Sequence, residues 1–110
     1  MKKLLLSVAL VASGATHAEF WDGNRLLEKL NSNNYFDQGT ALGYIMGVAD
    51  TGLGVVHCTP PNATAGQMES MVRNYLTNVP AERHRSADNI VSRILKTTWP
   101  CPDRPSGRAL

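Results

Sequence analysis

The stretch DQGTALGYIMGVADTGLGVVH, residues 37–57, decides the fold. Asp37 is a candidate N-cap, and the segment that it opens is apolar on most sides, which predicts a central and largely buried helix. At about 100° per residue, one arc of this helix holds only small or acidic residues, and the bulky apolar residues occupy another. The first arc comprises Gly39, Gly43, Gly47, Asp50 and Gly54, and the second comprises Leu42, Ile45, Met46, Ala49, Leu53 and Val56.

The arc around Gly43, Gly47 and Asp50 has two explanations. An unpaired carboxylate is costly to bury, so we favour a structural role, in which another helix or loop packs closely on the glycines and satisfies Asp50. In the functional alternative, the glycine groove is open and Asp50 contacts a partner. Glycines four residues apart also occur in membrane-helix dimers, but Asp50 argues against insertion.

Three further helices are expected around this segment. The first follows Asp22 and ends at the polar run from Asn31, and the next opens with Thr64 and Gln67, which have capping-box spacing, and stops at Pro80. The last follows Ser86 and ends before Pro100. The apolar residues that repeat at helical spacing are Leu26, Leu27 and Leu30, then Met68, Met71, Val72, Tyr75, Leu76 and Val79, then Ala87, Ile90, Val91, Ile94 and Leu95. The predicted fold is all-α, a compact bundle of four helices.

The ends of the chain differ from this domain. Residues 1–18 have the three parts of a secretory signal peptide: the charges of Lys2 and Lys3, an apolar run over residues 4–12, and a small-residue exit that predicts cleavage after Ala18. The run is shorter than the roughly 20 residues that span a bilayer, so no membrane insertion is expected after cleavage. A single domain over residues 19–102 then leads into a tail, residues 103–110, that lacks periodicity and is expected to be mobile.

The charge balance excludes one class of partner. The chain has 11 Lys and Arg against 9 Asp and Glu, and the excess is Lys2 and Lys3 of the signal peptide. The mature chain is therefore neutral and lacks the basic stripe typical of nucleic-acid binding.

Cys58 and Cys101 are the two cysteines of the chain. In an exported protein the oxidising compartment favours a disulfide between them, and closing so long a loop contributes up to roughly 4 kcal/mol in the chain-entropy model. A reactive thiol or a metal ligand is the alternative, but an isolated pair without CxxC spacing lacks the usual signature of either.

Candidates for catalysis are few. His57 beside Cys58 has the composition of a Cys/His dyad, although sequence neighbours at a helix end seldom face each other. Glycosidase chemistry would require a second carboxylate beside Asp50, and the sequence nominates none. We therefore expect no catalytic residue, cofactor or metal, and treat an enzyme as the minority hypothesis.

Two connections are the best candidates for contact with a partner. One contains Pro60, Pro61 and Asn62 and is stiffened by its prolines; the other contains Glu82, Arg83, His84 and Arg85 between two helix ends. Rigid loops on a helical scaffold suit protein recognition, while the alternative is that both are solvated connections.

An ordered set of motifs resembles the Rap/Tai family of type VI secretion immunity proteins. It comprises GYIMGVAD at residues 43–50, Cys58, Pro60 and Pro61, Gln67, Tyr75 and Leu76, Pro80, and the closing Trp99, Pro100 and Cys101. Members often carry a further cysteine pair, whose places here are Leu30 and Ala41, so the resemblance implies the loss of one disulfide.

The resemblance implies a periplasmic, all-helical and often dimeric protein that binds a peptidoglycan-cleaving amidase from a neighbouring cell and blocks its active site. Such a protein is an inhibitor and not an enzyme. Two other classes of exported protein stay open, an acid-stress chaperone and a lysozyme-type inhibitor of other specificity.

Overall fold

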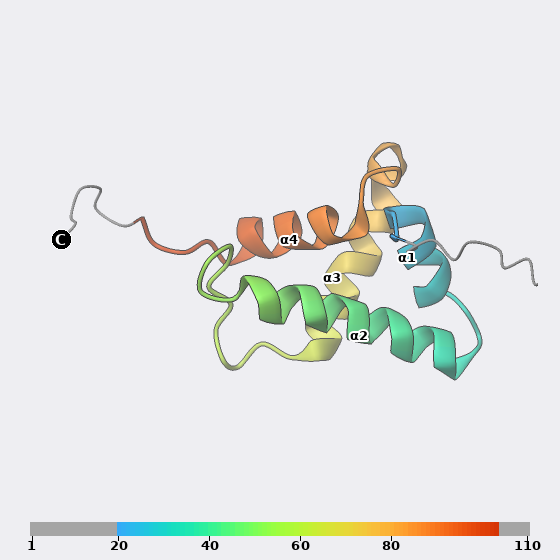
Figure 1. Cartoon of the computed structure of the whole chain (residues 1–110), viewed down its shortest axis with the longest axis horizontal. Helices are drawn as coiled ribbons and strands as arrows, with labels where there is room; N and C mark the ends of the chain where they lie inside the picture. The colour runs from blue at the N-terminus through green and yellow to red at the C-terminus, as the bar shows by residue number, and fades with distance from the viewer. Residues whose placement is uncertain (1–19, 104–110) are drawn as a thin grey trace, which may run out of the picture.

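The computed structural model describes residues 20–103, which form four α-helices and one short 3-10 helix (Figure 1). The elements are α1 (Gly23–Leu30), α2 (Tyr35–Gly52), α3 (Ala65–Asn78), η1 (Pro80–Glu82) and α4 (Ala87–Thr98). The predicted all-α bundle is confirmed. The predicted signal peptide, residues 1–18, and residues 104–110 of the predicted tail lie outside the described residues.

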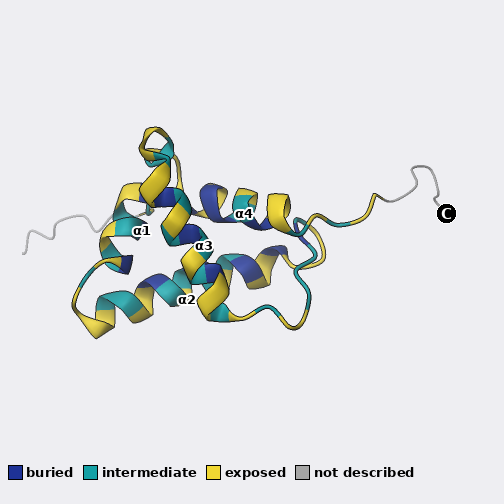
Figure 2. Cartoon of the chain, turned by 180° about the vertical axis from the view of Figure 1, so that it is seen from behind, coloured by how far each residue is buried: buried dark blue, intermediate teal, exposed yellow. Residues whose placement is uncertain are grey.

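The core lies where α2 packs against α1, α3 and α4. Buried residues line the inward side of each helix (Figure 2). Burying one large aliphatic side chain contributes about 1.5–3 kcal/mol, so this seam supplies most of the stabilisation. The core residues are Leu26, Leu30, Ala41, Ile45, Ala49, Met68, Val72, Leu76, Ala87, Ile90, Val91 and Leu95.

The predicted start of α2 is wrong, because the N-cap is Asn34. Its side-chain oxygen accepts the N–H groups of Phe36 at 2.7 Å and Asp37 at 3.3 Å. Asp37 instead accepts from the Ser32 hydroxyl at 2.9 Å and contacts Lys29 Nζ at 3.3 Å. The Ser32 hydrogen bond lowers the pKa of Asp37; burial opposes this shift, and Lys29 adds to it through a hydrogen bond and its charge. Asp37 thus ties the end of α1 to the first turn of α2.

The predicted end of α2 near His57 is also wrong, because the helix stops at Gly52. A tight turn follows, with Leu53 at φ −61° and ψ 129° and Gly54 at φ 83°. These angles are those of a type II turn, in which the second central residue needs a positive φ, and the Val55 N–H closes the turn on the Gly52 carbonyl at 3.0 Å. Gly54 is therefore what reverses the chain.

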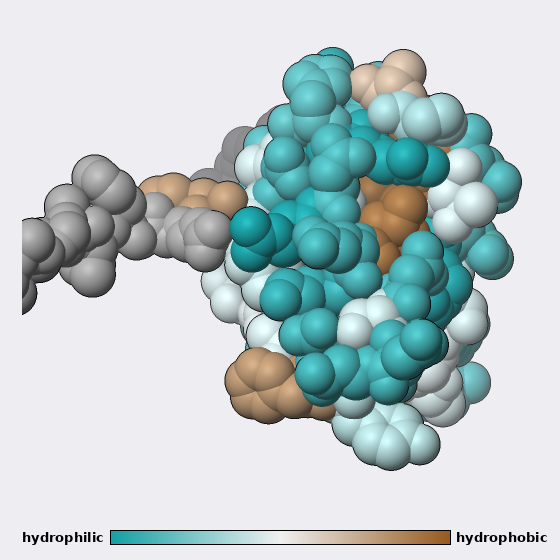
Figure 3. All heavy atoms as spheres, turned by 90° about the vertical axis from the view of Figure 1, so that its right-hand side faces the viewer, coloured by the Kyte–Doolittle hydropathy of each residue, from teal (hydrophilic) through white to brown (hydrophobic). Residues whose placement is uncertain are grey.

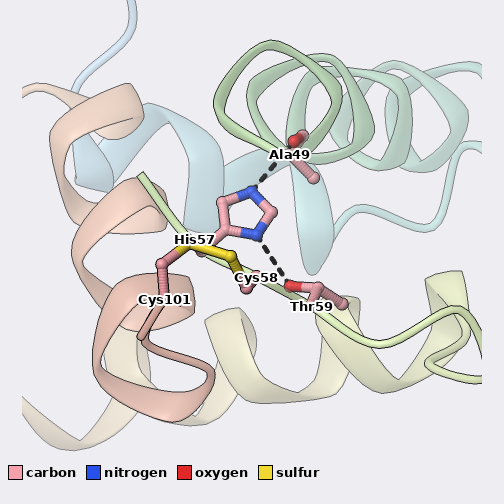
Figure 4. The surroundings of a disulfide bond; sticks show 5 residues. All are labelled: Ala49, His57, Cys58, Thr59 and Cys101. Carbon is pink, nitrogen blue, oxygen red and sulfur yellow. Dashed lines mark hydrogen bonds between the residues drawn. A yellow bond between two sulfur atoms is a disulfide. The ribbon is translucent and has the colours of Figure 1, made fainter. Parts of the chain in front are cut away.

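Past this turn, His57 is the buried polar residue of the described domain, with 1% of its surface exposed. Its Nε2 lies 2.9 Å from the Ala49 carbonyl oxygen, and its Nδ1 lies 2.7 Å from the Thr59 hydroxyl (Figure 4). A carbonyl can only accept, so Nε2–H is the donor. His57 therefore caps a carbonyl of the last turn of α2, which would otherwise lack a partner.

The predicted disulfide between Cys58 and Cys101 is present, next to the His57 ring (Figure 4). The Cys58 N–H also donates to the Trp99 carbonyl at 2.8 Å. The end of α2 is thereby joined to the end of α4. A Cys/His dyad is not formed, because the Cys58 sulfur is bonded to Cys101 and both His57 ring nitrogens are engaged elsewhere.

Replacing Cys58 and Cys101 together by serine should lower the free energy of unfolding by about 4 kcal/mol, the chain-entropy value for a loop of this length. The bridge spans 43 residues of sequence, so the unfolded chain gains much freedom without it. Urea denaturation of the oxidised protein and of the double variant measures the difference. Equal midpoints would show that the bridge does not stabilise the fold.

Replacing His57 by leucine should cost about 1–3 kcal/mol, because the Ala49 carbonyl keeps its burial and loses its donor. Replacing Thr59 by valine is the matched control, since it removes one ring contact and leaves the Ala49 hydrogen bond intact. The histidine variant should therefore melt well below the Thr59 variant. The reverse order would contradict the capping role.

Candidate protein-interaction site

The connection between α3 and α4, residues 79–86, is built around Arg83. Its Nε donates to the Leu76 carbonyl at 2.6 Å, and its Nη2 donates to the Thr77 carbonyl at 3.3 Å. These are carbonyls of the last turn of α3, which have no partner inside the helix and carry the negative end of its dipole. Arg83, predicted as a partner contact, thus caps α3 and holds the shape of the connection.

The same connection is hydrogen-bonded to the start of α1. The Gly23 N–H donates to the Arg85 carbonyl and the Asn24 N–H to the Arg83 carbonyl, both at 3.0 Å, and the Ala87 N–H donates to the Trp21 carbonyl at 2.9 Å. The first N–H groups of a helix normally lack partners, and here the connection supplies them. A Cβ on Gly23 would lie 2.9 Å from the Arg83 carbonyl oxygen, so only glycine permits this approach.

The other predicted residues of this connection have distinct environments. Glu82 accepts from Arg85 Nε and lies 3.5 Å from Nη2 of Arg93 on α4. His84 is exposed, and its Nδ1 donates to the Ala81 carbonyl at 3.0 Å. Arg93 lies on α4, 11 residues along the chain from Glu82. Nothing in its spacing indicated that the fold would bring it to Glu82.

The second predicted segment, with Pro60, Pro61 and Asn62, lies at the other end of α3. Pro61 and Asn62 are exposed, whereas Pro60 is half-buried and its carbonyl accepts the Ala63 N–H at 3.1 Å. The two connections flank the 14 residues of α3. At about 1.5 Å per residue the helix holds them roughly 21 Å apart, so they do not form one contiguous surface (Figure 1).

The glycine arc of α2 is open. Within residues 20–103, nothing lies within 4 Å of a Cβ built on Gly43 or Gly47, and Asp50 is exposed. The predicted close packing on these glycines and the predicted burial of Asp50 are therefore wrong. The reason is that Ala41, Ile45 and Ala49 turn the opposite side of α2 to the core.

A groove of about 620 Å³ adjoins these glycines. The Trp21 and Tyr44 rings stack along it, with centroids 4.9 Å apart and planes within 9°. Burial of Tyr44, followed by the charge of Asp88, raises the pKa of its hydroxyl, which therefore stays neutral. The remaining walls are Phe20, Val48, Thr51, Gly52, Val56, Ser86, Asp88 and Ser92.

The end of the molecule that carries α1 is mostly hydrophilic, with a hydrophobic area recessed among polar side chains (Figure 3). Residues 20–103 hold no cluster of His, Cys, Asp and Glu side chains suited to a metal ion. None of the helices described is both long and apolar enough to cross a membrane.

A family model described as Rap1a immunity proteins matches residues 22–101. The chain belongs to this family. The match to the Rap1a family runs from the N-cap of α1 to Cys101, so it includes all four helices and both connections. No curated protein matches the chain significantly. Membership of the Rap1a family indicates an immunity protein against a type VI effector and implies an inhibitor without catalysis of its own.

Replacing Gly23 by alanine should lower the free energy of unfolding by about 1–3 kcal/mol, because the new methyl group overlaps Ile90 Cδ1 and the Arg83 carbonyl. Gly43→Ala is the matched control. Its Cβ meets open space, and removing glycine from a helix interior should stabilise the domain by about 0.5–1 kcal/mol. Urea denaturation tests both signs, and a neutral Gly23 variant would refute the close approach.

Proposed function

We propose that this member of the Rap1a family is a periplasmic immunity protein that occludes the active site of a peptidoglycan-cleaving amidase delivered by type VI secretion. The family supports an effector as partner, and the signal-peptide pattern of residues 1–18 supports export to the compartment that contains peptidoglycan. The amidase is the effector class that the sequence resemblance implies.

The observation that best supports this proposal is that the α3–α4 connection is hydrogen-bonded to both α1 and α3. Its backbone is hydrogen-bonded to α1 through Arg83 and Arg85, and the Arg83 side chain fastens it to α3. A loop that is ordered before binding loses little conformational entropy when it enters a cleft. His84 and Arg85 are exposed on this connection and are the proposed contacts, while Glu82 and Arg83 position them.

The proposal includes a homodimer, as the resemblance implies. Pro60, Pro61 and Asn62 remain a second proposed contact, independent of the α3–α4 connection.

The test uses the mature chain and a type VI effector of the same strain, sought among the genes that neighbour its own. His84→Ala/Arg85→Ala should raise the Kd for the effector by at least about tenfold, because truncating interface anchors typically costs more than 1 kcal/mol. Calorimetry measures the Kd, and release of soluble peptidoglycan fragments measures inhibition of the effector.

Ser70→Ala/Asn74→Ala is the matched control, since it truncates two exposed residues of α3 outside both connections. If Pro61→Ala/Asn62→Ala weakens binding and the His84→Ala/Arg85→Ala variant does not, the wrong connection has been assigned. Turnover of purified peptidoglycan by the mature chain alone would refute an inhibitor. An effector without amidase activity would refute the proposed target.

A further inference from the structure

Two arginines share one carboxylate on the outer side of α4, and a lysine lines the same hollow as the arginines. Arg85 and Arg93 both contact Oε1 of Glu82, and Lys96 lies almost one turn beyond Arg93. Lys96 makes no ion pair within residues 20–103. With Glu82 counted, the three cations keep a net charge of about +2 at neutral pH, and Asp88 in the adjoining groove lowers that of the combined region to about +1.

The cluster surrounds a hollow and retains free donors. Arg85, Arg93 and Lys96 line a hollow of about 300 Å³ together with Asn89, Ser92 and Val56. Arg85 contacts Glu82 through its Nε atom, and Arg93 contacts Glu82 through its Nη2 atom. Each guanidinium carries five N–H donors, so most of them remain available, and about half of each arginine side chain is exposed, 51% in both cases.

This basic hollow continues into the aromatic groove. Val56 and Ser92 line both, so the cations lie on one side of Val56 and the Trp21–Tyr44 stack lies on the other. The walls come from the segment before α1, from α2 and the turn after it, from the α3–α4 connection and from α4. We call this combined region the basic–aromatic surface, defined by Arg85, Arg93, Lys96, Val56, Trp21 and Tyr44.

We propose that the basic–aromatic surface binds a segment of the effector in which a carboxylate side chain neighbours a large apolar one. This inference rests on the proposed function and names the chemistry of the partner surface. Guanidinium groups bind carboxylates through paired, charge-assisted hydrogen bonds, and a net positive cluster repels a basic partner. The adjoining groove removes an apolar side chain from water, which a small anion alone would not use.

Binding of the effector by charge-reversed and control variants tests the proposal. Arg93→Glu/Lys96→Glu should raise the Kd by at least about thirtyfold and weaken its dependence on sodium chloride, because attraction becomes repulsion. Val56→Ser should raise the Kd about fivefold through lost apolar burial. Lys96→Gln should weaken binding, whereas Lys29→Gln, the same change on α1, should not. Thermal melting of each variant confirms that it is folded.

Three outcomes overturn the proposal. If the reversed variant binds the effector as tightly as the parent chain, the surface is not the docking site, and the proposed function stands. If sodium acetate shifts the side-chain NMR signals of Arg85, Arg93 and Lys96 while the reversal leaves effector binding unchanged, the hollow is a site for small anions only. If the parent chain binds no effector, the proposed function fails and the docking site fails with it.

Discussion

The junction around Cys58 holds the C-terminal ends of α2 and α4 together, and the remaining geometry depends on it. The disulfide joins the segment after α2 to the segment after α4, the Cys58 N–H binds the Trp99 carbonyl, and His57 closes the last turn of α2. At its other end α4 is held by the hydrogen bond between Ala87 and Trp21. Because α4 is fixed at both ends beside α2, the groove between these helices has defined walls. A domain of this size has a thin margin of stability, so a covalent link at this point has a large effect.

The arginines at the proposed interface have two roles, ordering the backbone and offering donors to a partner. The Arg83 side chain is half-buried and donates hydrogen bonds to carbonyls of α3, so it sets the shape of the α3–α4 connection. Arg85 and Arg93 share one carboxylate oxygen of Glu82 and keep donors directed to solvent. All three residues are arginines, so the difference between their roles comes from where the fold places each side chain. A protein that inhibits by occupying a cleft needs both roles, because contacts are effective only when their backbone is already ordered.

The outer face of α2 shows why an unusual residue pattern has no single interpretation. Gly39, Gly43, Gly47 and Asp50 do share a face, as their spacing predicts. A stripe of small residues is compatible both with a closely packed neighbour and with an open surface, and helical periodicity does not distinguish them. The three neighbouring helices all pack on the side of Ala41, Ile45 and Ala49. Asp50 is therefore hydrated and requires no buried partner.

By itself, the sequence determined the helices, the core positions of α1, α3 and α4, the capping box of α3 and the pairing of Cys58 with Cys101, because each depends on spacing along the chain or on the number of cysteines. It did not determine the core side of α2, where Ala41 is buried and the predicted Leu53 is 54% exposed. It misplaced both ends of α2, since Asn34 and Asp37 are both acceptable caps and a type II turn at Gly54 is not visible in an apolar run. Only the tertiary structure decided that Arg83 is a cap, that the glycine face is open, and that Arg93 and Lys96 join Arg85 beside Val56. These are contacts between side chains on different elements, and the relative placement of the elements arises from packing of the whole core.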